Sequence, residues 1–457
     1  MKVYINRILN LKKIKALGFD VDYTLVRYNT KVFEEFTYHA VKEKLVSIKK
    51  YPDKVLNLPF DYARAIQGLV IDKKHGNVLK LSRFGKVKQA YHGTHHMEFG
   101  DMQRIYQQQV IDLGSEDIQS LDTNFSIANG VLYAELVALK DLGANIPSYE
   151  TIAHDVKEMI DVVHRDGTLK NEVKNHLSKY IIVDPNLALL LERYKAYDKK
   201  LIIITNSDFS YCKTLLDYSI TPYLKEHKDW QELFDVVITF SMKPRFFIER
   251  NHFLKVDPET SLMSNYDGKV DQGIFQGGNS YRLQKDLGLD GEEILYLGDH
   301  IYGDVVSIKK TCNWRTALVM EPLSEELDSL KRAHPISLEL SRLMIEKEKI
   351  ETEIISFYTQ EHEQGRRLKR EALNGLYQKV EEINHLMSEK VVQYQTHFNS
   401  YWGELMRAGL EESRFAGQME KYACIYMEKI TDLLKCSPRT YFRPNRRILP
   451  HERDFLT

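Results

Sequence analysis

Four short segments of this chain carry the residue types that phosphoryl transfer requires. They are GFDVDYTL at 18–25, IIITNSD at 202–208, the pair Lys243–Pro244, and ILYLGDHIYGD at 294–304. Three of them follow runs of apolar, mostly β-branched or aromatic residues, which is typical of buried strands. Ligands of an open parallel sheet bind just beyond the carboxyl ends of its strands. The four segments in this order therefore indicate a phosphoryl-transfer site at one edge of such a sheet.

The first segment contains two carboxylates, Asp20 and Asp22. A carboxylate at a strand end can attack phosphorus and form an aspartyl-phosphate. A side chain two residues later points the same way in an extended segment, so Asp22 can protonate the leaving oxygen and later deprotonate water. For this role Asp22 must hold a proton, and neighbouring carboxylates would raise its pKa whereas a bound metal would lower it. Thr24 closes the turn and can hold Asp22 in place.

A second group of carboxylates, Asp299 and Asp304, follows another apolar run. Together with Asp20 their oxygens suit Mg²⁺, which prefers a few carboxylates plus phosphate and water oxygens. A cation is required because phosphate is repelled by several carboxylates unless their charge is neutralised. Asp304 has two further interpretations, a structural Asp-Gly loop or a partner that orients Lys243.

The remaining two segments supply donors for phosphate oxygens. Thr205 and Asn206 offer a hydroxyl and an amide, and a helix beginning at about Ser207–Ser210 would add backbone N–H groups. Lys243 supplies positive charge for the phosphoryl group as it is transferred. A Lys-Pro pair alone is uninformative, but its position between the second and fourth segments makes it part of the pattern.

The composition of the chain excludes several classes of protein. Its 64 basic and 65 acidic residues nearly cancel to a formal net charge of −1, so no basic field favours nucleic acid. The four cysteines are scattered without a CxxC pair, which is typical of reduced thiols. We find neither a signal-peptide pattern nor a membrane-spanning stretch. We therefore expect a cytoplasmic protein with no nucleic-acid or membrane partner.

The apolar runs also predict how the chain is organised. The predicted strands are Ala16–Phe19, Leu201–Thr205, Val236–Phe240, Ile294–Leu297 and Thr316–Met320. Helical stretches between them favour βαβ units and a parallel sheet. Far more residues separate the first two strands than one crossover needs, so residues 33–189 are expected to form an inserted cap domain. Residues 1–32 and 190–334 would then form a discontinuous catalytic core.

The C-terminal region has a different pattern. Beyond Pro335, apolar residues at helical spacing predict two helices that fold into a hairpin around Gly365, and a third helix at about Met419–Leu434. The Pro- and Arg-rich end is expected to wrap the surface or a subunit partner. The predicted fold class is therefore α/β: a doubly wound parallel sheet with a large inserted cap and a helical C-terminal extension over 335–457.

The four segments resemble the haloacid-dehalogenase superfamily, and more narrowly the cytosolic purine 5′-nucleotidases that hydrolyse IMP and GMP. The resemblance covers most of the chain. It includes TNSDFSY at 205–211, FQGGNS at 275–280, DVVHRDGTLK at 161–170, and KYACIY and LPHE near the C-terminus.

The resemblance implies a role for each matching residue. Asp20 would be the nucleophile and Asp22 the general acid/base, and Mg²⁺ would be held by Asp20, the Asp22 carbonyl and Asp299. Thr205 and Lys243 would act in catalysis, with Thr24 and Asp304 in supporting roles. The implied phosphate-binding residues are Thr205, Asn206, Ser207, Lys243 and Lys170. The implied nucleotide-binding residues of the inserted domain are Phe125, Lys157, Asp161 and His164, which Lys170 adjoins.

These residues suit a 6-oxopurine. Phe125 or His164 could stack on the base, Asp161 could accept the N1–H of hypoxanthine or guanine, and Lys157 could donate to O6. AMP would present the wrong partners to both, and leaving buried polar groups unpaired costs about 1–3 kcal/mol each. The chain departs from the family in this region, where Lys157 replaces an arginine and Arg165 replaces an aromatic residue.

The predicted function is Mg²⁺-dependent hydrolysis of purine nucleoside 5′-monophosphates through an aspartyl-phosphate. A nucleoside could replace water as the acceptor and give phosphotransferase activity. Two alternatives remain, a phosphatase for another small phosphate such as a sugar phosphate, and an inactive nucleotide-binding scaffold. The resemblance further implies a homo-oligomer, a dimer or tetramer, and an effector region near Tyr302, Lys309 and Lys310.

Overall fold

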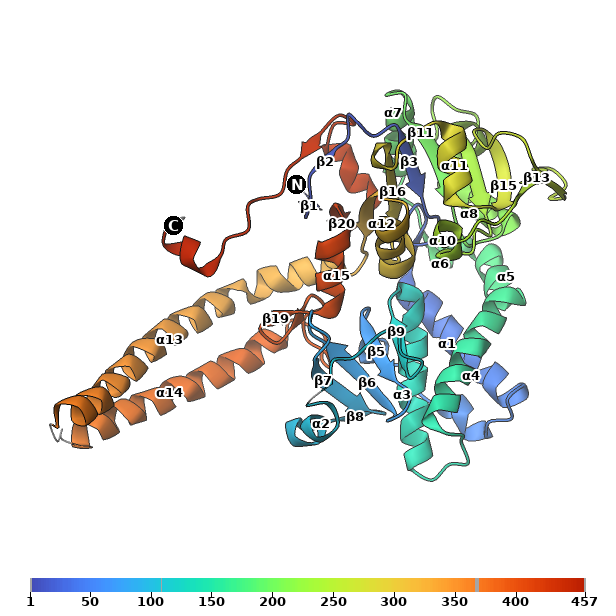
Figure 1. Ribbon diagram of the computed structural model, residues 1–457. Helices are drawn as coiled ribbons and strands as arrows, with labels where there is room; N and C mark the ends of the chain where they lie inside the picture. The colour runs from blue at the N-terminus through green and yellow to red at the C-terminus, as the bar shows by residue number, and fades with distance from the viewer. Residues whose placement is uncertain (1, 108, 366–369, 456–457) are drawn as a thin grey trace. The chain divides into compact units, whose positions relative to one another are not determined.

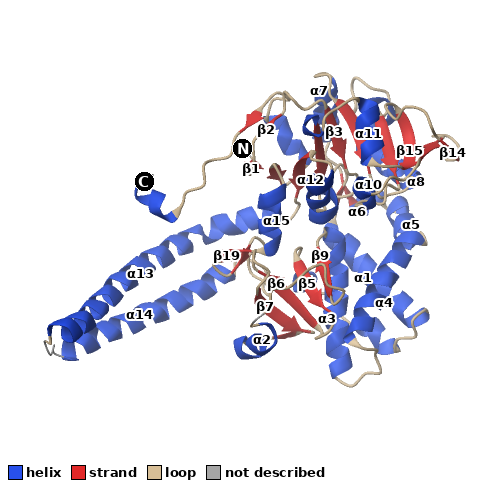
Figure 2. Cartoon of the chain, in the orientation of Figure 1, coloured by secondary structure: helices blue, strands red, loops and turns tan. Residues whose placement is uncertain are grey.

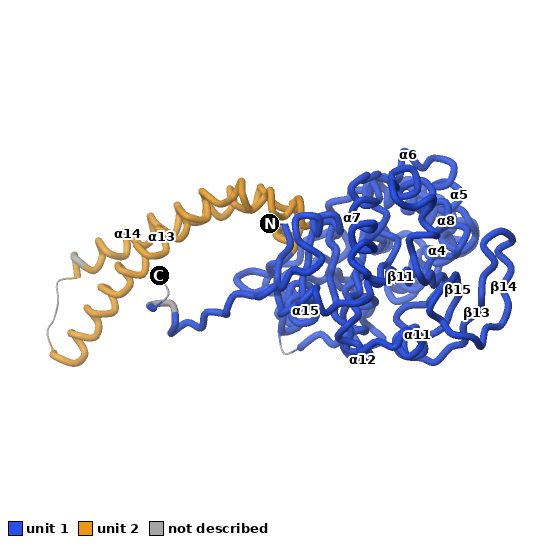
Figure 3. The backbone as a smooth tube through the Cα atoms, turned by 90° about the horizontal axis from the view of Figure 1, so that it is seen from above, with its two compact units in different colours: residues 1–321, 406–457 blue, residues 322–405 orange. Residues whose placement is uncertain are grey.

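The computed structural model describes residues 2–107, 109–365 and 370–455. Contacts within the described chain form two compact units, 1–321 with 406–457, and 322–405 (Figure 3). The predicted core and the predicted inserted domain thus fall in one unit, which also contains the C-terminal segment.

The first unit is built on a ten-stranded sheet with the order β1-β20-β17-β16-β3-β11-β12-β15-β13-β14 (Figures 1 and 2). The strands from β20 to β15 run parallel to their neighbours, and β1, β13 and β14 at the edges are antiparallel. The large parallel sheet confirms the α/β prediction. Its strands are β1 (Val3–Ile5), β3 (Ala16–Phe19), β11 (Lys200–Ile204), β12 (Val236–Thr239), β13 (Phe253–Val256), β14 (Met263–Asn265), β15 (Gly273–Gly277), β16 (Ile294–Gly298), β17 (Arg315–Val319) and β20 (Ile425–Met427).

The order of these strands reverses at β3. After β11 the chain moves outward through β12 to β15, then returns to β16 on the other side of β3 and continues outward to β17. Crossovers between parallel strands are right-handed. When the chain moves outward on both sides of β3, the connecting helices therefore lie on opposite faces of the sheet. The switch point beside β3 is where an open α/β sheet binds its ligand. The helices of this part are α7 (Asn186–Lys195), α8 (Phe209–Ser219), α9 (Trp230–Leu233), α10 (Arg245–Ile248), α11 (Ser280–Leu287), a π-helix (Ile301–Val306), α12 (Ser307–Thr311) and α15 (Arg414–Tyr422).

The central strands are apolar along their whole length because both faces of the sheet are covered. In β11, the residues from Leu201 to Ile204 are at most 1% exposed, and β12 is equally buried. Such uninterrupted runs made the central strands predictable. The strands β13 to β15 were not predicted, since they are short and β15 is bounded by glycines.

The segment between β3 and β11 forms its own layer of sheet and helices. A five-stranded antiparallel sheet has the order β8-β7-β6-β5-β9, and long helices pack beside it (Figure 2). β4 (Arg27–Tyr28), which precedes this sheet in the chain, pairs with β10 (Ile181–Ile182), which follows it. The other elements are β5 (Leu69–Asp72), β6 (Asn77–Leu81), β7 (Val87–His92), β8 (His95–His96), β9 (Ile118–Leu121), α1 (Thr30–Ser47), α2 (Phe99–Tyr106), α3 (Ile127–Asp141), α4 (Tyr149–Arg165), α5 (Thr168–Asn175) and α6 (Leu177–Tyr180).

The second unit consists mainly of two long helices, α13 (Leu323–Gln364) and α14 (Arg370–Gln395), which lie side by side (Figure 3). α13 begins before Pro335 and contains it, so the predicted start at that proline was too late. It ends at Gly365, whose positive φ of 64° suits a glycine C-cap. None of the helices in the described ranges combines the length and the apolar character that a membrane crossing requires.

The predicted third C-terminal helix over Met419–Leu434 is wrong. α15 ends at Tyr422, and residues 425–427 form strand β20, which lies between β1 and β17 in the main sheet and runs parallel to β17. A 3₁₀ turn, Ile430–Lys435, follows. A short apolar run that is buried on all sides has no distinctive periodicity, so a strand and a helix cannot be told apart there. Further on, β21 (Tyr441–Phe442) pairs with β2 (Leu9–Asn10).

Candidate active site

Three adjacent strands bring the predicted catalytic residues together. Phe19 at the end of β3 is in register with Ile203 of β11 and with Leu297 of β16. Asp20 therefore lies between the residues that follow the other two strands, Thr205 and Asp299. The backbone N–H of Asp20 donates to Leu297 O at 2.9 Å, which extends the sheet pairing to Asp20 itself.

Lys243 is a buried cation at the centre of this edge. Its ammonium lies 2.9 Å from Asp20 Oδ2 and 2.8 Å from Asp304 Oδ1, and it donates to the Tyr296 hydroxyl at 2.9 Å. Its side chain is only 4% exposed. Burial alone would lower the pKa of Lys243, but the charges of Asp20 and Asp304 outweigh it and raise the pKa well above its ordinary value. The side chain thus remains an ammonium ion.

The loop after β11 holds Lys243 in place. Asn206 Oδ1 accepts from the backbone N–H of Lys243 at 2.6 Å, and Asn206 Nδ2 donates to Lys243 O at 3.2 Å. Thr205 is fully buried, and its Oγ1 accepts from the Ser207 N–H at 3.2 Å. α8 begins just beyond, with Asp208 as its N-cap. Asn206 is therefore already engaged with the backbone that carries Lys243.

Asp22 is oriented by two hydroxyl groups. Ser207 Oγ donates to Asp22 Oδ2 and Tyr28 Oη donates to Asp22 Oδ1, each at 2.6 Å. Burial, followed by the charge of Asp20, raises the pKa of Asp22, which favours the protonated form that a general acid needs. Thr24 N–H donates to Val21 O at 3.3 Å and closes the turn, but the Thr24 hydroxyl has no partner among the described residues.

Three carboxylates form a cluster that could hold a divalent metal ion. One oxygen from each of Asp20, Asp299 and Asp304 lies within 4.8 Å of the others. Burial raises the pKa of Asp20 and raises that of Asp299 well above its ordinary value, and repulsion between carboxylates adds to both shifts. Asp299 Oδ2 is buried and has no hydrogen-bond partner among the described residues. Such an orphaned oxygen beside other carboxylates fits a cation site.

Asp304 is held differently from the other two carboxylates. Its Oδ1 accepts from Lys243 and its Oδ2 accepts from the backbone N–H of His300 at 3.1 Å. A Cβ added to Gly298 would lie 2.3 Å from Asp304 Oδ2, so only glycine leaves room for this carboxylate. The sequence left several interpretations of Asp304 open. The hydrogen bond from Lys243 to Asp304 Oδ1 supports the one in which Asp304 orients Lys243.

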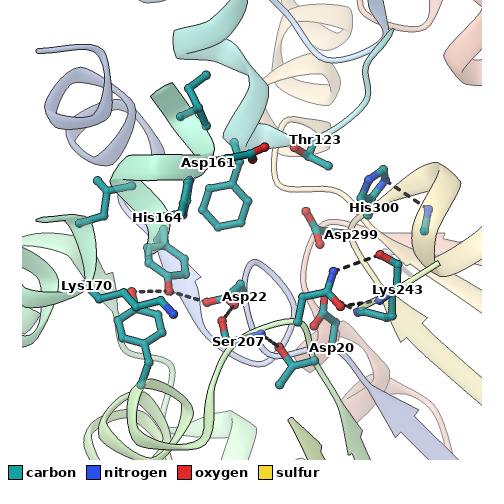
Figure 4. Close-up of a pocket in the computed structure, with 18 of the residues that line it drawn as sticks. Asp20, Asp22, Thr123, Asp161, His164, Lys170, Ser207, Lys243, Asp299 and His300 are labelled. Atoms are coloured by element: carbon teal, nitrogen blue, oxygen red, sulfur yellow. Dashed lines mark hydrogen bonds and ion pairs between the residues drawn. The ribbon is translucent and has the colours of Figure 1, made fainter. Parts of the chain in front are cut away.

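These residues form one wall of a cavity of about 430 Å³ (Figure 4). The opposite wall comes from the inserted segment. It includes Phe125, Asp161, His164 and Lys170, as the sequence predicted, together with Arg165. Lys157 is not part of the described lining, although it lies one turn before Asp161 on α4 and its side chain is exposed.

The aromatic part of this wall surrounds Phe125. Its ring centroid lies 4.6 Å from that of Tyr23, 5.4 Å from that of Phe33 and 5.7 Å from that of His164. Burial, with a contribution from the charge of Lys170, lowers the pKa of His164 to about 4. The imidazole is therefore neutral near pH 7. Lys170 donates to Asp208 Oδ2 and so links α5 to the start of α8.

Several lining residues were not predicted from the sequence. His300 lies within the fourth segment, directly after Asp299, and that position could have identified it. Its Nδ1 accepts from Gly303 N–H at 3.3 Å, and burial and the charge of Lys243 lower its pKa to about 4. Tyr28 and Tyr211 were not predicted either; their hydroxyl groups are 3.1 Å apart, although the two residues lie far apart in the chain.

A second cavity of about 930 Å³ lies beside the π-helix that follows Asp299. Tyr302 and Lys310 line it, together with side chains from the inserted segment and from the C-terminal part of the first unit. Lys309 is not part of the described lining and donates to Asn313 Oδ1 at 3.3 Å. Two of the three residues of the implied effector region thus face this cavity.

Comparisons with known proteins give matches along most of the chain. A model of the 5′ nucleotidase family matches residues 3–454. A 5′-nucleotidase domain-containing protein of Dictyostelium discoideum is 27% identical over 468 residues, covering 98% of this chain and 74% of its own. 5′-Nucleotidase domain-containing protein 2 of Rattus norvegicus is 24% identical over 492 residues, covering 98% of this chain and 80% of its own.

Two solved structures are also similar to part of the chain. A hydrolase from Pseudomonas syringae is 14% identical, with a TM-score of 0.25, and the match covers 67% of this chain and 84% of the hydrolase. A dehalogenase is 11% identical, with a TM-score of 0.22, and the match covers 67% of this chain and 85% of the dehalogenase.

Proposed function

The chain belongs to the 5′ nucleotidase family and is a 5′-nucleotidase, and we propose that its substrates are purine nucleoside 5′-monophosphates, with IMP and GMP preferred and Mg²⁺ as the metal. One observation carries this proposal. A single cavity has Asp20, Asp22 and Lys243 on one wall, and aromatic and polar side chains suited to a purine on the other (Figure 4). A sugar phosphate would need only the first wall.

The proposed reaction has two steps that share one covalent intermediate. Asp20 attacks phosphorus, the bond from phosphorus to the ribose O5′ breaks, and Asp22 gives its proton to that oxygen. Water then attacks the aspartyl-phosphate, its proton passes to Asp22, and the bond between Asp20 and phosphorus breaks to release phosphate. Lys243 stabilises the charge on the transferring group. If a nucleoside hydroxyl replaces water in the second step, the product is a new nucleotide.

The metal has a defined place in this scheme. The carboxylates of Asp20 and Asp299, with the Asp22 carbonyl, would hold Mg²⁺, whose charge allows phosphate to approach the carboxylates. The buried Asp299 Oδ2, which has no hydrogen-bond partner in the described part of the chain, supports this assignment. Asp304 already accepts from Lys243 and from the His300 backbone, so we assign it to positioning Lys243.

The base would be read by α4 and the turn before α3. Phe125 supplies a flat apolar surface for the purine, and Asp161 would accept N1–H. We propose Arg165 as a second candidate for the O6 donor, in addition to Lys157. Arg165 is among the described residues that line the cavity, and Lys157 is not. Arg165 Nε donates to Asp161 O at 3.2 Å, which holds the guanidinium next to the base-reading carboxylate.

The test is phosphate release from IMP, GMP, AMP, UMP and a sugar phosphate, with Mg²⁺ and with EDTA, using Asp20→Ala as the blank. The proposal predicts Mg²⁺-dependent release that is fastest with IMP and GMP. Faster release from AMP or the sugar phosphate would refute the base assignment and leave the core chemistry intact. No release from any substrate by a folded sample would support the inactive scaffold instead.

A further inference from the structure

Glu34 carries a fully buried carboxyl group that the proposed chemistry does not use. It lies on α1 and has no exposed surface. Its Oε2 accepts from the backbone N–H of Ala128 at 2.7 Å, and its Oε1 has no hydrogen-bond partner among the described residues. Burial raises the pKa of Glu34 to about 8, although hydrogen bonds from Ala128 and Ile127 oppose the shift. Burying such a group is costly, so its contact with α3 requires an explanation.

The contact gives a hydrogen-bond acceptor to a backbone N–H group in the first turn of α3. The first N–H groups of a helix have no partner within the helix, and a side-chain oxygen at the N-cap commonly accepts from one of them. Ser126 occupies that position in α3 but makes no capping bond, since its hydroxyl is paired with Thr123 Oγ1 at 3.0 Å. The carboxylate of Glu34, from another helix, takes its place at Ala128.

The capped turn carries Phe125. The residues Asn124–Ser126 form a single 3₁₀ turn that leads directly into α3. The ring of Phe125 packs against Phe33, the neighbour of Glu34 on α1, with centroids 5.4 Å apart. α1 therefore holds Phe125 in two ways, through a ring contact and through the carboxylate that fixes the backbone just after it.

We propose that Glu34 is a positioning residue that fixes the purine-binding surface of Phe125 by capping α3 from α1. This inference rests on the proposed function, which assigns Phe125 to the base. A binding surface that is held before the substrate arrives loses less entropy on binding than one that must be ordered. Without the carboxylate, the N–H of Ala128 would be buried and unpaired, so the turn would shift to find another partner. A substrate without a base would be unaffected.

The experiment compares IMP with p-nitrophenyl phosphate, which has the reacting phosphate and no purine. For Glu34→Ala we expect KM for IMP to rise and kcat/KM to fall by about tenfold, while kcat/KM for p-nitrophenyl phosphate changes by less than about twofold. Glu34→Gln should retain KM for IMP because its amide oxygen still accepts from Ala128. If Glu34→Ala does not fold, Glu34→Met, which is closer in volume, replaces it.

Glu192→Ala is the matched control. Glu192 is also buried and accepts from two backbone N–H groups, those of Lys225 at 2.9 Å and Glu226 at 2.6 Å, away from the cavity. Its loss should lower stability without a change that is specific to IMP. Equal losses with both substrates in Glu34→Ala or Glu34→Met, or an unchanged KM for IMP, would overturn the proposal, as would a raised KM in Glu34→Gln. A wild-type enzyme that cleaves p-nitrophenyl phosphate but not IMP would refute the proposed function instead.

Discussion

Replacing Lys243 with methionine should damage both stability and catalysis. The side chain is 4% exposed and its ammonium lies within 2.9 Å of two carboxylates. Removing one partner of a buried ion pair leaves uncompensated charge and costs about 3–5 kcal/mol. Loss of one group that stabilises the transition-state charge costs about 10²–10³-fold in kcat. Lys243→Met should therefore lower the free energy of unfolding by about 3–5 kcal/mol and lower kcat by about 10²–10³-fold.

The assay measures urea unfolding at pH 7 in EDTA, and phosphate release from IMP in Mg²⁺. Lys42→Met is the matched control, since Lys42 is 2% exposed and donates to uncharged groups, the carbonyl oxygens of Leu56 and Leu58, at 2.9 and 2.7 Å. It should lose stability and keep kcat. If Lys243→Met retained kcat within about threefold, well short of the loss expected for such a group, the argument from the buried charge cluster would be refuted.

Substitutions at Gly298, Glu34 and Arg165 should each have a distinct effect. Gly298→Ala places a Cβ 2.3 Å from Asp304 Oδ2 and should lower kcat by about 10²-fold through displacement of that carboxylate; unchanged turnover would show that Asp304 is dispensable. The pKa of Glu34 is about 8 in the folded protein, against an ordinary value of 4.5. Between pH 4.5 and pH 8 the folded state therefore binds more protons than the unfolded state. The free energy of unfolding should fall as the pH rises through this range. Glu34→Gln should flatten that slope in urea titrations, and an unaltered slope would contradict the assignment. Arg165→Ala should raise KM for IMP by about 5–10-fold and leave that for AMP unchanged; equal effects on both would rule out a role in reading O6.

The catalytic wall was predictable because its residues follow strands that are themselves conspicuous. Phe19, Ile204 and Gly298 end uninterrupted apolar runs, and each is followed within one residue by Asp20, Thr205 or Asp299. Parallel strands in register then bring these residues to one edge of the sheet. The local sequence determined both the residue type and its place in the fold.

The cavity wall contributed by the inserted segment was harder to predict, because it depends on which part of a helix faces the cavity. Lys157 and Arg165 lie on the same helix, two turns apart, and helical periodicity alone does not say which of them lines the pocket. The role of Glu34 had no sequence signal, since its partner Ala128 belongs to a helix far along the chain. The short strand β20 was predicted to be a helix for a related reason, namely that a brief buried run has no period of its own.

Trapping the covalent intermediate would identify the nucleophile most directly. The enzyme would be mixed with IMP labelled in its phosphate, quenched in acid during turnover, digested with trypsin, and examined for label on the peptide 16–27. If Asp20 is the nucleophile, a hydroxylamine-sensitive phosphate should appear on Asp20 of that peptide and be absent from Asp20→Asn. Continued turnover with label on another peptide, or undiminished turnover by Asp20→Asn, would contradict this role of Asp20.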